Sequence, residues 1–526
     1  MAAESDTKAL AQAGPQRVLG DDQFREVVGR RSQILLNAAS FFVQLHSAGR
    51  NPTRPLLGEL MSQSIQMEEL LDTHGAKNNV RWSPLRSLVA AIKLFSDVSY
   101  ELLHIRHALP IYRLLPIEHD FAADVDKTLS FTCEVLLRAA GALLKRAHRL
   151  GLPIPRCLLL DAAYEESLPL GQLVHDRTTR TIENVPETVS GLATAFLNLA
   201  AESERLQVPR GTAPADYPSC IPDPISERHL RHLQHQFHSL QSLYDTYVCE
   251  TKTENLDRDL PVLRGHISVV FHLLKSATAF SHYYERHVEP HLVQPGETAG
   301  MIVAADELLG ALMDFSLAYA NRYRASAQNL CRDMLKRYAE VGAIQVPVPR
   351  YRGFHVRPST LVAKIVLHYG SDVEMEMDGE MYDASTPLEI FRANEKINAR
   401  KRRWLAAEVG QLPFMAAARS GEDVAALVRR AVMELTEKHK VVIYEQPLRV
   451  SDDLAAADGT VQERVTNEIA RLQSTGRIDI ECELMINFIG DKRVLADIRL
   501  LAENGYGEDN FGNNIPLPRE LSYLRR

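Results

Sequence analysis

Apolar residues recur every three or four positions through most of the first 340 residues of this chain. Examples are the runs 24–35 and 85–95, and this spacing is that of one face of an α-helix. The pattern predicts an all-helical region from about residue 21 to residue 342. Proline-rich breaks interrupt this region, and the longest of them, residues 208–225, is a predicted linker between two helical parts.

The two helical parts differ in the length of their predicted helices. Residues 21–207 are divided by several breaks and form a first helical subdomain, which a flexible leader over residues 1–20 precedes. The second part, residues 226–342, contains three longer stretches of helical periodicity, over residues 226–253, 261–287 and 304–340. Long neighbouring helices usually pack antiparallel, so the second part is predicted to be a long-helix bundle.

At Ile344 the spacing of the apolar residues changes from the helical period of about 3.6 residues to a period of two residues. Residues 344–348 alternate in this way, and residues 373–377 alternate valine or methionine with glutamate, which is typical of strands with one buried face. The pair Asp378–Gly379 then predicts a tight hairpin turn into a second short strand. A helix opened by Pro358 is predicted between the first two of these strands.

Further elements complete this region. A helix is predicted after Ser385, a strand over residues 412–417 and a last helix over residues 424–435. The predicted order over residues 343–440 is therefore β-α-β-β-α-β-α, which would form an antiparallel sheet with helices packed on one face. Beyond it, residues 441–526 are predicted to be a small α+β extension with a turn-rich tail. The predicted fold class is multidomain, with a helical N-terminal region followed by α+β regions.

Composition and charge favour a modular globular protein. The 526 residues exceed one ordinary core, and 45% of them are hydrophobic and 24% charged. The formal net charge of −8 argues against attraction of the whole molecule to nucleic acid or to anionic lipid. No apolar stretch is long enough to span a bilayer, and the first residues lack the apolar run of a secretory signal. We therefore expect a cytoplasmic protein without a membrane span.

Cysteine and histidine positions do not favour a metal site. The six cysteines are scattered without a CxxC pair, so we expect reduced core thiols and not zinc ligands or a disulfide framework. Histidines recur every three residues over 229–238, a spacing that drifts around a helix, and histidine and glutamate gather over 282–291. We expect both groups to lie on solvated helix faces or at helix ends, with neither a metal nor a cofactor bound.

His355 stands immediately before the helix that Pro358 opens, in the stretch YRGFHVRPSTLV. A helix N-terminus presents unpaired backbone N–H groups and a partial positive charge, so it stabilises an anion. A neutral imidazole nitrogen can attack phosphorus near neutral pH. Arg357 can neutralise a transferred phosphoryl group, and the hydroxyl groups of Ser359 and Thr360 can add donors. These residue types predict a phosphohistidine site.

The segment Gly353–Ser359 resembles the active-site segment of the HPr family, the histidine phosphocarriers of the bacterial phosphotransferase system. The family pattern reads glycine, an aliphatic residue, histidine, any residue, arginine, proline, and alanine or serine. Phe354 stands where the family has the aliphatic residue. The order of elements predicted over residues 343–440 is also similar to that family, so the resemblance covers the motif and the domain around it.

The resemblance implies a function for this domain. His355 would receive a phosphoryl group that originates from phosphoenolpyruvate and arrives through Enzyme I, and Arg357 would stabilise it. Ser385 would occupy the position at which some family members carry a serine phosphorylated by an HPr kinase, and a serine two residues before Pro387 also suits a helix N-cap. The sequence has neither a phosphate-binding glycine loop nor the phosphohistidine segment of Enzyme I. We therefore expect a phosphocarrier that a partner phosphorylates, not a self-standing enzyme.

Two departures from the family bear on the role of the domain. It follows a long helical region, which indicates regulation through that region and an unidentified partner, in place of bulk sugar transport. The helix predicted over residues 388–410 is longer than its family counterpart and carries the basic run 396–403. Two alternatives stay open. One is an interaction scaffold with an HPr-like fold and no phosphate, and the other is a nucleic-acid-binding regulator that uses residues 396–403.

Overall fold

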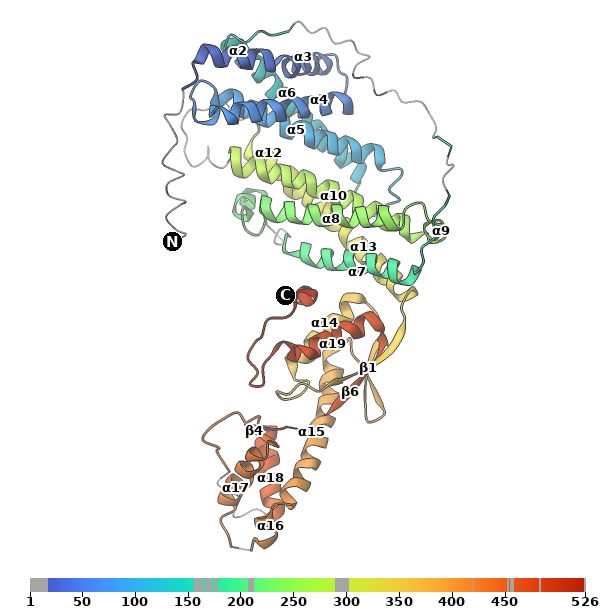
Figure 1. Ribbon diagram of the computed structural model, residues 1–526, viewed down its shortest axis with the longest axis vertical. Helices are drawn as coiled ribbons and strands as arrows, with labels where there is room; N and C mark the ends of the chain where they lie inside the picture. Colours follow the sequence, from blue (N-terminus) through green and yellow to red (C-terminus); the bar gives the residue numbers. More distant parts are fainter. Residues whose placement is uncertain are drawn as a thin grey trace, which may run out of the picture. The chain divides into compact units, whose positions relative to one another are not determined.

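The computed structural model describes residues 18–155, 178–206, 212–288, 302–419, 421–451, 458–481 and 484–524, together with residues 164, 166, 173, 174 and 454. The chain is mostly helical, with a small four-stranded sheet and a two-stranded ladder (Figure 1). It divides into two compact units, residues 1–182 with 203–327 and residues 183–202 with 328–526. A helix-rich multidomain fold is therefore confirmed.

The described part of the first unit contains helices and no regular strand. Its α-helices are α2 (Asp21–Arg31), α3 (Gln33–Ser47), α4 (Arg54–Thr73), α5 (Ser83–Ala108), α6 (Phe121–Arg149), α8 (Glu227–Tyr247), α9 (Lys252–Leu256), α10 (Asp259–Tyr283), α12 (Ala305–Gly310) and the first half of α13 (Ala318–Arg337). Two π-helical stretches, η6 (Tyr284–Val288) and η7 (Ala311–Leu317), follow α10 and α12.

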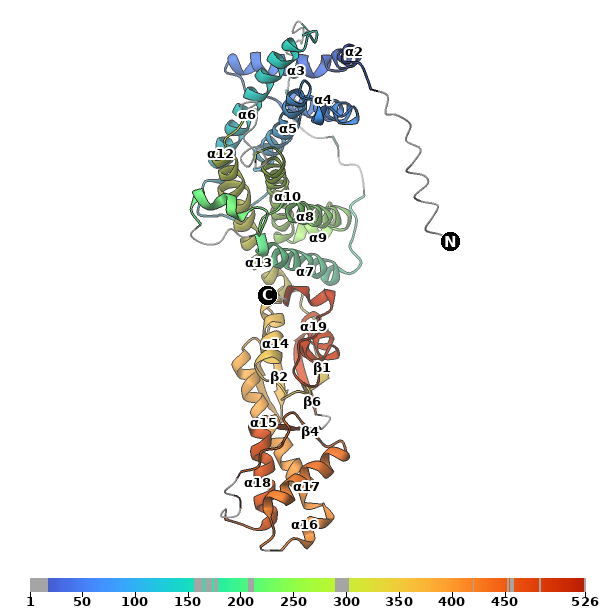
Figure 2. The same ribbon diagram turned by 90° about the vertical axis from the view of Figure 1, so that its left-hand side faces the viewer.

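Apolar stripes on these helices form the core of the first unit. Helix α5 packs against α4, α6 and α10, and α10 also packs against α8 (Figure 2). The long helices predicted between residues 226 and 340 are confirmed as α8, α10 and the series α12, η7 and α13. Of the predicted linker 208–225, the described residues 212–225 lie within the first unit and include a 3₁₀-helix, η5 (Pro214–Cys220).

The second unit holds a four-stranded antiparallel sheet in the order β1-β6-β2-β3. Phe488 at the centre of β6 pairs with Ile344 of β1 on one side and Met375 of β2 on the other. Asp378 and Gly379 both have positive φ, 52° and 79°, which is the backbone of the tight hairpin turn that the sequence predicts. The strands are β1 (Val341–Pro347), β2 (Val373–Met377), β3 (Glu380–Asp383) and β6 (Met485–Asp491).

Three helices pack over one face of this sheet, namely α14 (Val356–Tyr369), α15 (Pro387–Gly410) and α19 (Lys492–Glu503). Helix α19 contacts β1 and β6, α15 contacts β2 and β3, and α14 contacts both of these helices. The covered face is apolar, with Met375 and Phe488 fully buried. The opposite face is polar, since the Asn487 amide donates to Glu376 at 3.1 Å there. The period of two in the sequence reflects this difference between the faces.

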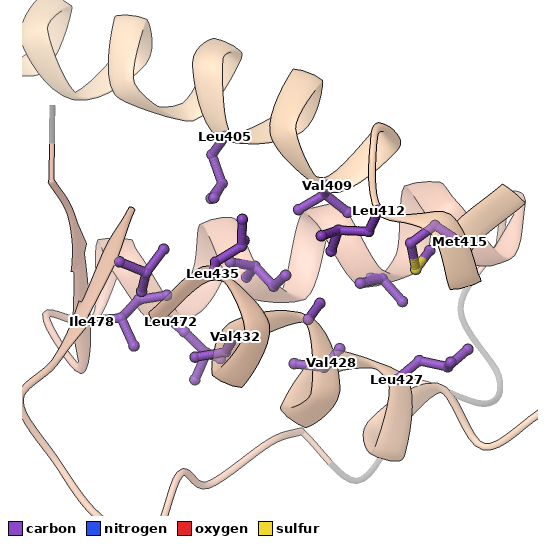
Figure 3. Close-up of a cluster of buried hydrophobic side chains, with 14 of the residues drawn as sticks. Leu405, Val409, Leu412, Met415, Leu427, Val428, Val432, Leu435, Leu472 and Ile478 are labelled. Atoms are coloured by element: carbon purple, nitrogen blue, oxygen red, sulfur yellow. The ribbon is translucent and has the colours of Figure 1, made fainter. Parts of the chain in front are cut away.

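Residues 411–484, the inserted subdomain, stand between α15 and β6 and form a hydrophobic core of their own (Figure 3). Leu405 and Val409 of α15 project into this core, in which Leu435 and Leu472 are fully buried. The second half of the long helix α15 therefore packs against the inserted subdomain and contributes to its core. Its elements are α16 (Pro413–Ala417), α17 (Val424–Glu437), β4 (Val441–Ile443), α18 (Val461–Ser474) and β5 (Ile478–Ile480).

The sequence prediction is wrong about the fourth strand of the sheet. Residues 412–417 contain helix α16, and the strand between β1 and β2 is β6. The helix predicted over residues 424–435 exists as α17, but it belongs to the inserted subdomain, whereas α19 packs on the sheet. Residues 412–417 and 485–491 are both short runs with apolar positions, and local periodicity does not tell which of them pairs with a distant strand.

Candidate functional site

His355 is held by the loop that joins β1 to α14. Arg352 and Gly353 in this loop both adopt left-handed backbone, with φ of 56° and 62°. Asn394 of α15 fixes the turn, because its side-chain oxygen accepts the Phe354 N–H at 2.9 Å and its amide donates to the Arg352 carbonyl at 3.2 Å. A Cβ at position 353 would lie 2.3 Å from that oxygen, so only glycine fits there.

A buried ion pair supports the same loop from the inserted subdomain. Lys401 Nζ lies 3.0 Å from Asp479 Oδ2, and the two side chains are 3% and 5% exposed. Asp479 also accepts the Arg352 N–H at 3.0 Å, and the Arg352 guanidinium donates to the Gly476 carbonyl at 2.7 Å. The desolvated carboxylate is thus matched by several donors, as a buried charge has to be. The loop that carries His355 therefore depends on α15 and on β5.

His355 is the N-cap residue of α14, and its ring lies against a carboxylate. Its Nε2 atom is 2.8 Å from Oε1 and 3.0 Å from Oε2 of Glu508. The imidazole is 25% exposed, whereas the Glu508 side chain is 2% exposed. The ring of Tyr351 meets the imidazole edge to face, with 5.5 Å between the centroids. One ring nitrogen is thus engaged by a buried acid, while part of the ring stays accessible to a reaction partner.

Arg357 approaches the same carboxylate from the first turn of α14. Its Nη1 atom lies 3.9 Å from Glu508 Oε2 and is buried without a hydrogen-bond partner among the described residues. The rest of the side chain is accessible, at 37% exposed. Because α14 begins at Val356, the N–H groups of Val356 and Arg357 have no partner within the helix. These N–H groups and the guanidinium form the cationic end of the site.

The hydroxyl groups of Ser359 and Thr360 are used by the helix itself. Ser359 is buried and donates to the Phe354 carbonyl at 2.8 Å, and Thr360 donates to the Val356 carbonyl at 2.6 Å. A hydroxyl group has one proton to donate, so in this geometry neither residue offers a donor to an anion beside His355. Their predicted role as phosphate ligands therefore has no counterpart in these contacts, and the two side chains stabilise the helix start.

Ser385 is not the cap of α15. The N-cap residue is Thr386, and it makes no side-chain cap hydrogen bond. The hydroxyl and the N–H of Ser385 both donate to Asp383, each at 2.8 Å. The hydrogen bond from the Ser385 hydroxyl lowers the pKa of the Asp383 carboxyl. A phosphate on Ser385 would stand beside this carboxylate and repel it.

Sequence reasoning missed Glu508, although its acidic side chain is central to the site. The residue stands 153 positions after His355, in the turn-rich tail. A 3₁₀-helix, η9 (Gly505–Gly507), precedes Glu508. The backbone of Glu508 forms an isolated antiparallel bridge with Asn514. The only signal in the sequence is an acid among glycines and asparagines, which predicts a turn and says nothing about its partner.

The basic run 396–403 is largely neutralised within the second unit. Lys401 pairs with Asp479 in the interior, Lys396 pairs with Glu380, and Arg400 Nη1 lies 3.4 Å from Asp378. These partners remove much of the positive charge that a nucleic-acid interface needs. The alternative of a nucleic-acid-binding regulator therefore gains no support from the contacts of this helix.

The other candidate groups also remain without a ligand-binding geometry. Among the described residues, no three histidine, cysteine or acidic side chains converge as a metal site, and Glu289 and His291 lie outside them. Cys133, Cys220 and Cys331 are free and buried, and Cys249 is free and half-buried. Cys157 and Cys482 lie outside the described residues. In the searched part of the chain no helix has the length and apolar character needed to cross a membrane.

Comparison of the chain with protein families, curated proteins and solved structures finds no match.

Proposed function

We propose that His355 accepts a phosphoryl group from an Enzyme I-like donor of a phosphoenolpyruvate-dependent phosphotransferase chain. The observation that carries the proposal is an accessible imidazole at the N-terminus of α14, with Arg357 on the first helical turn. The segment Gly353–Ser359 around it resembles the phosphohistidine segment of the HPr family. A helix N-terminus and a guanidinium group together favour a doubly charged phosphoryl group.

The topology of the second unit supports the same proposal. With the inserted subdomain set aside, the elements β1, α14, β2, β3, α15, β6 and α19 follow one another in the chain. This is the order β-α-β-β-α-β-α that the resemblance implies, and the sheet is antiparallel with helices over one face. The His355 loop follows the first strand, as the resemblance also implies. An HPr-like domain that carries a large insertion after its second helix is the reading we favour.

A contact of α14 within the second unit also bears on the proposed regulatory role. Helix α14 has His355 at its start and His368 near its end, and His368 Nε2 lies 2.9 Å from Asn198 Oδ1. Asn198 belongs to α7 (Val185–Ser203), which precedes the sheet by more than a hundred residues of sequence. Phosphorylation adds close to two negative charges at the start of α14. We infer that α14 passes this change to α7, and that the protein acts as a cytoplasmic phosphoacceptor with a regulatory role.

Transfer of labelled phosphate from phosphoenolpyruvate through purified Enzyme I tests the proposal. We expect acid-labile label on the wild type and none on His355→Ala. The matched control is His148→Ala, which removes an exposed histidine of α6 and should leave labelling unchanged. Label that persists in His355→Ala would assign the phosphate to another residue. No label on the wild type would favour the interaction scaffold.

A further inference from the structure

The four-stranded sheet has two edge strands, β1 and β3, and they differ in length and in charge. Strand β3 has four residues and an acidic residue at each end, and Lys396 of α15 pairs with Glu380 there. Strand β1 has seven residues and no charged side chain. Proteins usually protect an open edge from other strands by making it short or by placing charges on it. Strand β3 has both protections, whereas β1 has neither.

The direction of the hydrogen bonds of β1 follows from the contacts at its two ends. In an antiparallel ladder every second residue bonds to the neighbouring strand, and the residues between them point the other way. The Glu340 carbonyl accepts the Lys492 N–H at 2.8 Å, and the Val348 N–H donates to the Leu484 carbonyl at 2.9 Å. The register between them is regular, so the even-numbered residues of β1 bond to β6.

The odd-numbered residues of β1 therefore point their backbone groups away from β6, to the open edge. Val341, Ala343 and Gln345 are exposed, and no described residue pairs with their N–H and C=O groups. The open row ends at Pro347, which has no N–H and whose carbonyl already accepts the Tyr506 hydroxyl at 2.7 Å. The edge thus offers a short row of residues with donors and acceptors in equal number.

We propose that β1 pairs antiparallel with β1 of a second copy of this chain, about a two-fold axis at Ala343. In this register Ala343 faces Ala343 of the second copy, and Val341 faces Gln345 of the second copy. Every N–H and C=O group of these residues then has a partner on both chains. A shift of the axis by one residue along β1 leaves one of the three without a counterpart among them. The inference does not depend on the proposed function.

The side chains beside this axis are complementary in size. Gly342 and Ile344 lie on the covered face, and the axis places each opposite the other as a close pair, with about 4.5 Å between the Cα atoms. Ile344 is half-buried in the single chain. A Cβ at position 342 would lie 2.9 Å from Lys492 Cγ, so Ile344 of the second copy meets the Gly342 backbone and the aliphatic stem of Lys492. The pairing therefore covers apolar surface as well as backbone groups.

The symmetry of the edge favours a copy of the same chain over an unrelated strand. The open backbone groups have the same arrangement in both directions from Ala343, and a two-fold contact requires this of both partners. An unrelated extended segment could pair with an edge of any pattern. Because β1 carries no charge, the two-fold axis also brings no like charges together.

Sedimentation equilibrium of the full-length protein tests the pairing. The measured mass should rise from that of one chain toward twice that mass between about 1 μM and about 100 μM, a range that saturates a micromolar contact. Ala343→Lys places like charges directly opposite each other and should keep the protein monomeric. Met381→Lys adds the same charge to an exposed residue of β3 and should dimerise like the wild type. A monomeric wild type, or an Ala343→Lys variant that still dimerises, would overturn the proposal.

A mixture of two variants tests the position of the axis. Ala343→Glu should be monomeric by itself, and an equimolar mixture with Ala343→Lys should form a heterodimer, because opposite charges then face each other. This rescue also requires both variants to be folded, so it distinguishes repulsion from loss of the fold. With thermal unfolding confirming that both variants are folded, a mixture that stays monomeric would contradict the placement of Ala343 opposite itself.

Amide hydrogen exchange examines the edge directly. The N–H groups of Val341, Ala343 and Gln345 should exchange rapidly in the monomer and slowly at the concentration at which the dimer forms. Those of Gly342 and Ile344, which bond to β6, should be protected at both concentrations. A dimer in which the edge amides still exchange rapidly would place the contact elsewhere. Slowing that needs a different protein would assign the edge to a foreign strand, and either result would refute pairing with a second copy.

Discussion

The conformation of the His355 loop is fixed by polar side chains that each contact more than one partner. Asn394 holds Phe354 and Arg352 through one amide, and Asp479 holds Arg352 and Lys401 through one carboxylate. The sequence predicts the motif at His355, because glycine, histidine, arginine and proline stand together. It does not predict the contacts of Asn394, Asp479 or Glu508 with this loop, since a polar residue that acts from 40 to 153 positions away leaves no local pattern.

Removal of Lys401 should destabilise the protein, because it leaves Asp479 charged and buried. Lys401→Met should lower the free energy of unfolding by about 3–5 kcal/mol, the usual cost of breaking a buried pair from one side. Arg403→Met changes an exposed residue of the same basic run and should stay within about 0.5 kcal/mol of the wild type. Chemical denaturation measures both values. Equal stability of the two variants would mean that Lys401 is not paired in the interior.

His368 should make the stability of the second unit depend on pH. Burial, with a contribution from Arg332, lowers the pKa of His368 to about 4. The unfolded chain takes up this proton near pH 6.5 and the folded protein only near pH 4, so the unfolded state binds more protons between these values. Stability is therefore lost as the pH falls from about 6.5 toward 4, by on the order of 3 kcal/mol.

Replacement of this histidine tests its share of the acid sensitivity. His368→Gln does not titrate, so it should lose less stability than the wild type between about pH 7.5 and about pH 5. The measurement is the free energy of unfolding in denaturant at both pH values. The His368 ring stacks on the Tyr523 ring, with 4.1 Å between the centroids. Because His368→Gln loses this contact, the variant should also be less stable than the wild type at neutral pH. An equal loss of stability on acidification in both proteins would contradict the assigned cause.

Elements that depend on local sequence patterns could be predicted. Strands that form by pairing with residues distant in the sequence could not. The hairpin at Asp378–Gly379 and the helix after Pro358 follow from turn chemistry and periodicity, and both are present. The prediction of the fourth strand is wrong, because the partners of the observed strand β6, namely β1 and β2, lie more than a hundred residues earlier in the chain. The inserted subdomain separates them, and nothing in the local pattern of residues 412–417 reveals that they lie outside the sheet.

Two core substitutions distinguish the observed strand from the predicted one. Phe488 is fully buried in β6, and the centroid of its ring lies 6.2 Å from that of Phe354, the residue before His355. Phe488→Ala should therefore lower the free energy of unfolding by about 3–5 kcal/mol and slow phosphorylation of His355. Met415 is buried in the inserted subdomain, so Met415→Ala should destabilise that core by about 2–5 kcal/mol without slowing the transfer. Denaturation and transfer assays measure these effects. A reversed pattern would favour residues 412–417 as the strand beside the His355 loop.

At the scale of the whole molecule, the chain combines a helical unit with a unit that joins a small sheet, the inserted subdomain and the helix α7. The sequence predicts a helical N-terminal region, and this is confirmed. It does not predict that residues 183–202 associate with the sheet-containing unit, because helical periodicity gives the apolar face of a helix and not its partner. Helix α14 connects the His355 loop to α7 within this unit.

Phosphorylation should therefore alter the dynamics of the second unit beyond the site itself. We expect amide hydrogen exchange to change in α14 and in α7, where Asn198 contacts His368, and to stay unchanged in α5 of the first unit. The comparison is between phosphorylated wild type and unphosphorylated wild type, with His355→Ala treated with Enzyme I as the control. A change confined to the His355 loop would contradict transmission along α14.

Phosphoryl transfer to His355 is tested most directly by mapping the product of the Enzyme I reaction. The full-length protein is incubated with phosphoenolpyruvate and Enzyme I, digested at neutral pH and analysed by mass spectrometry. We predict one acid-labile phosphoryl group per chain, on the peptide that contains His355. An unmodified His355 peptide after complete phosphorylation of a control phosphocarrier would contradict the phosphoacceptor function and leave an interaction scaffold as the function to test.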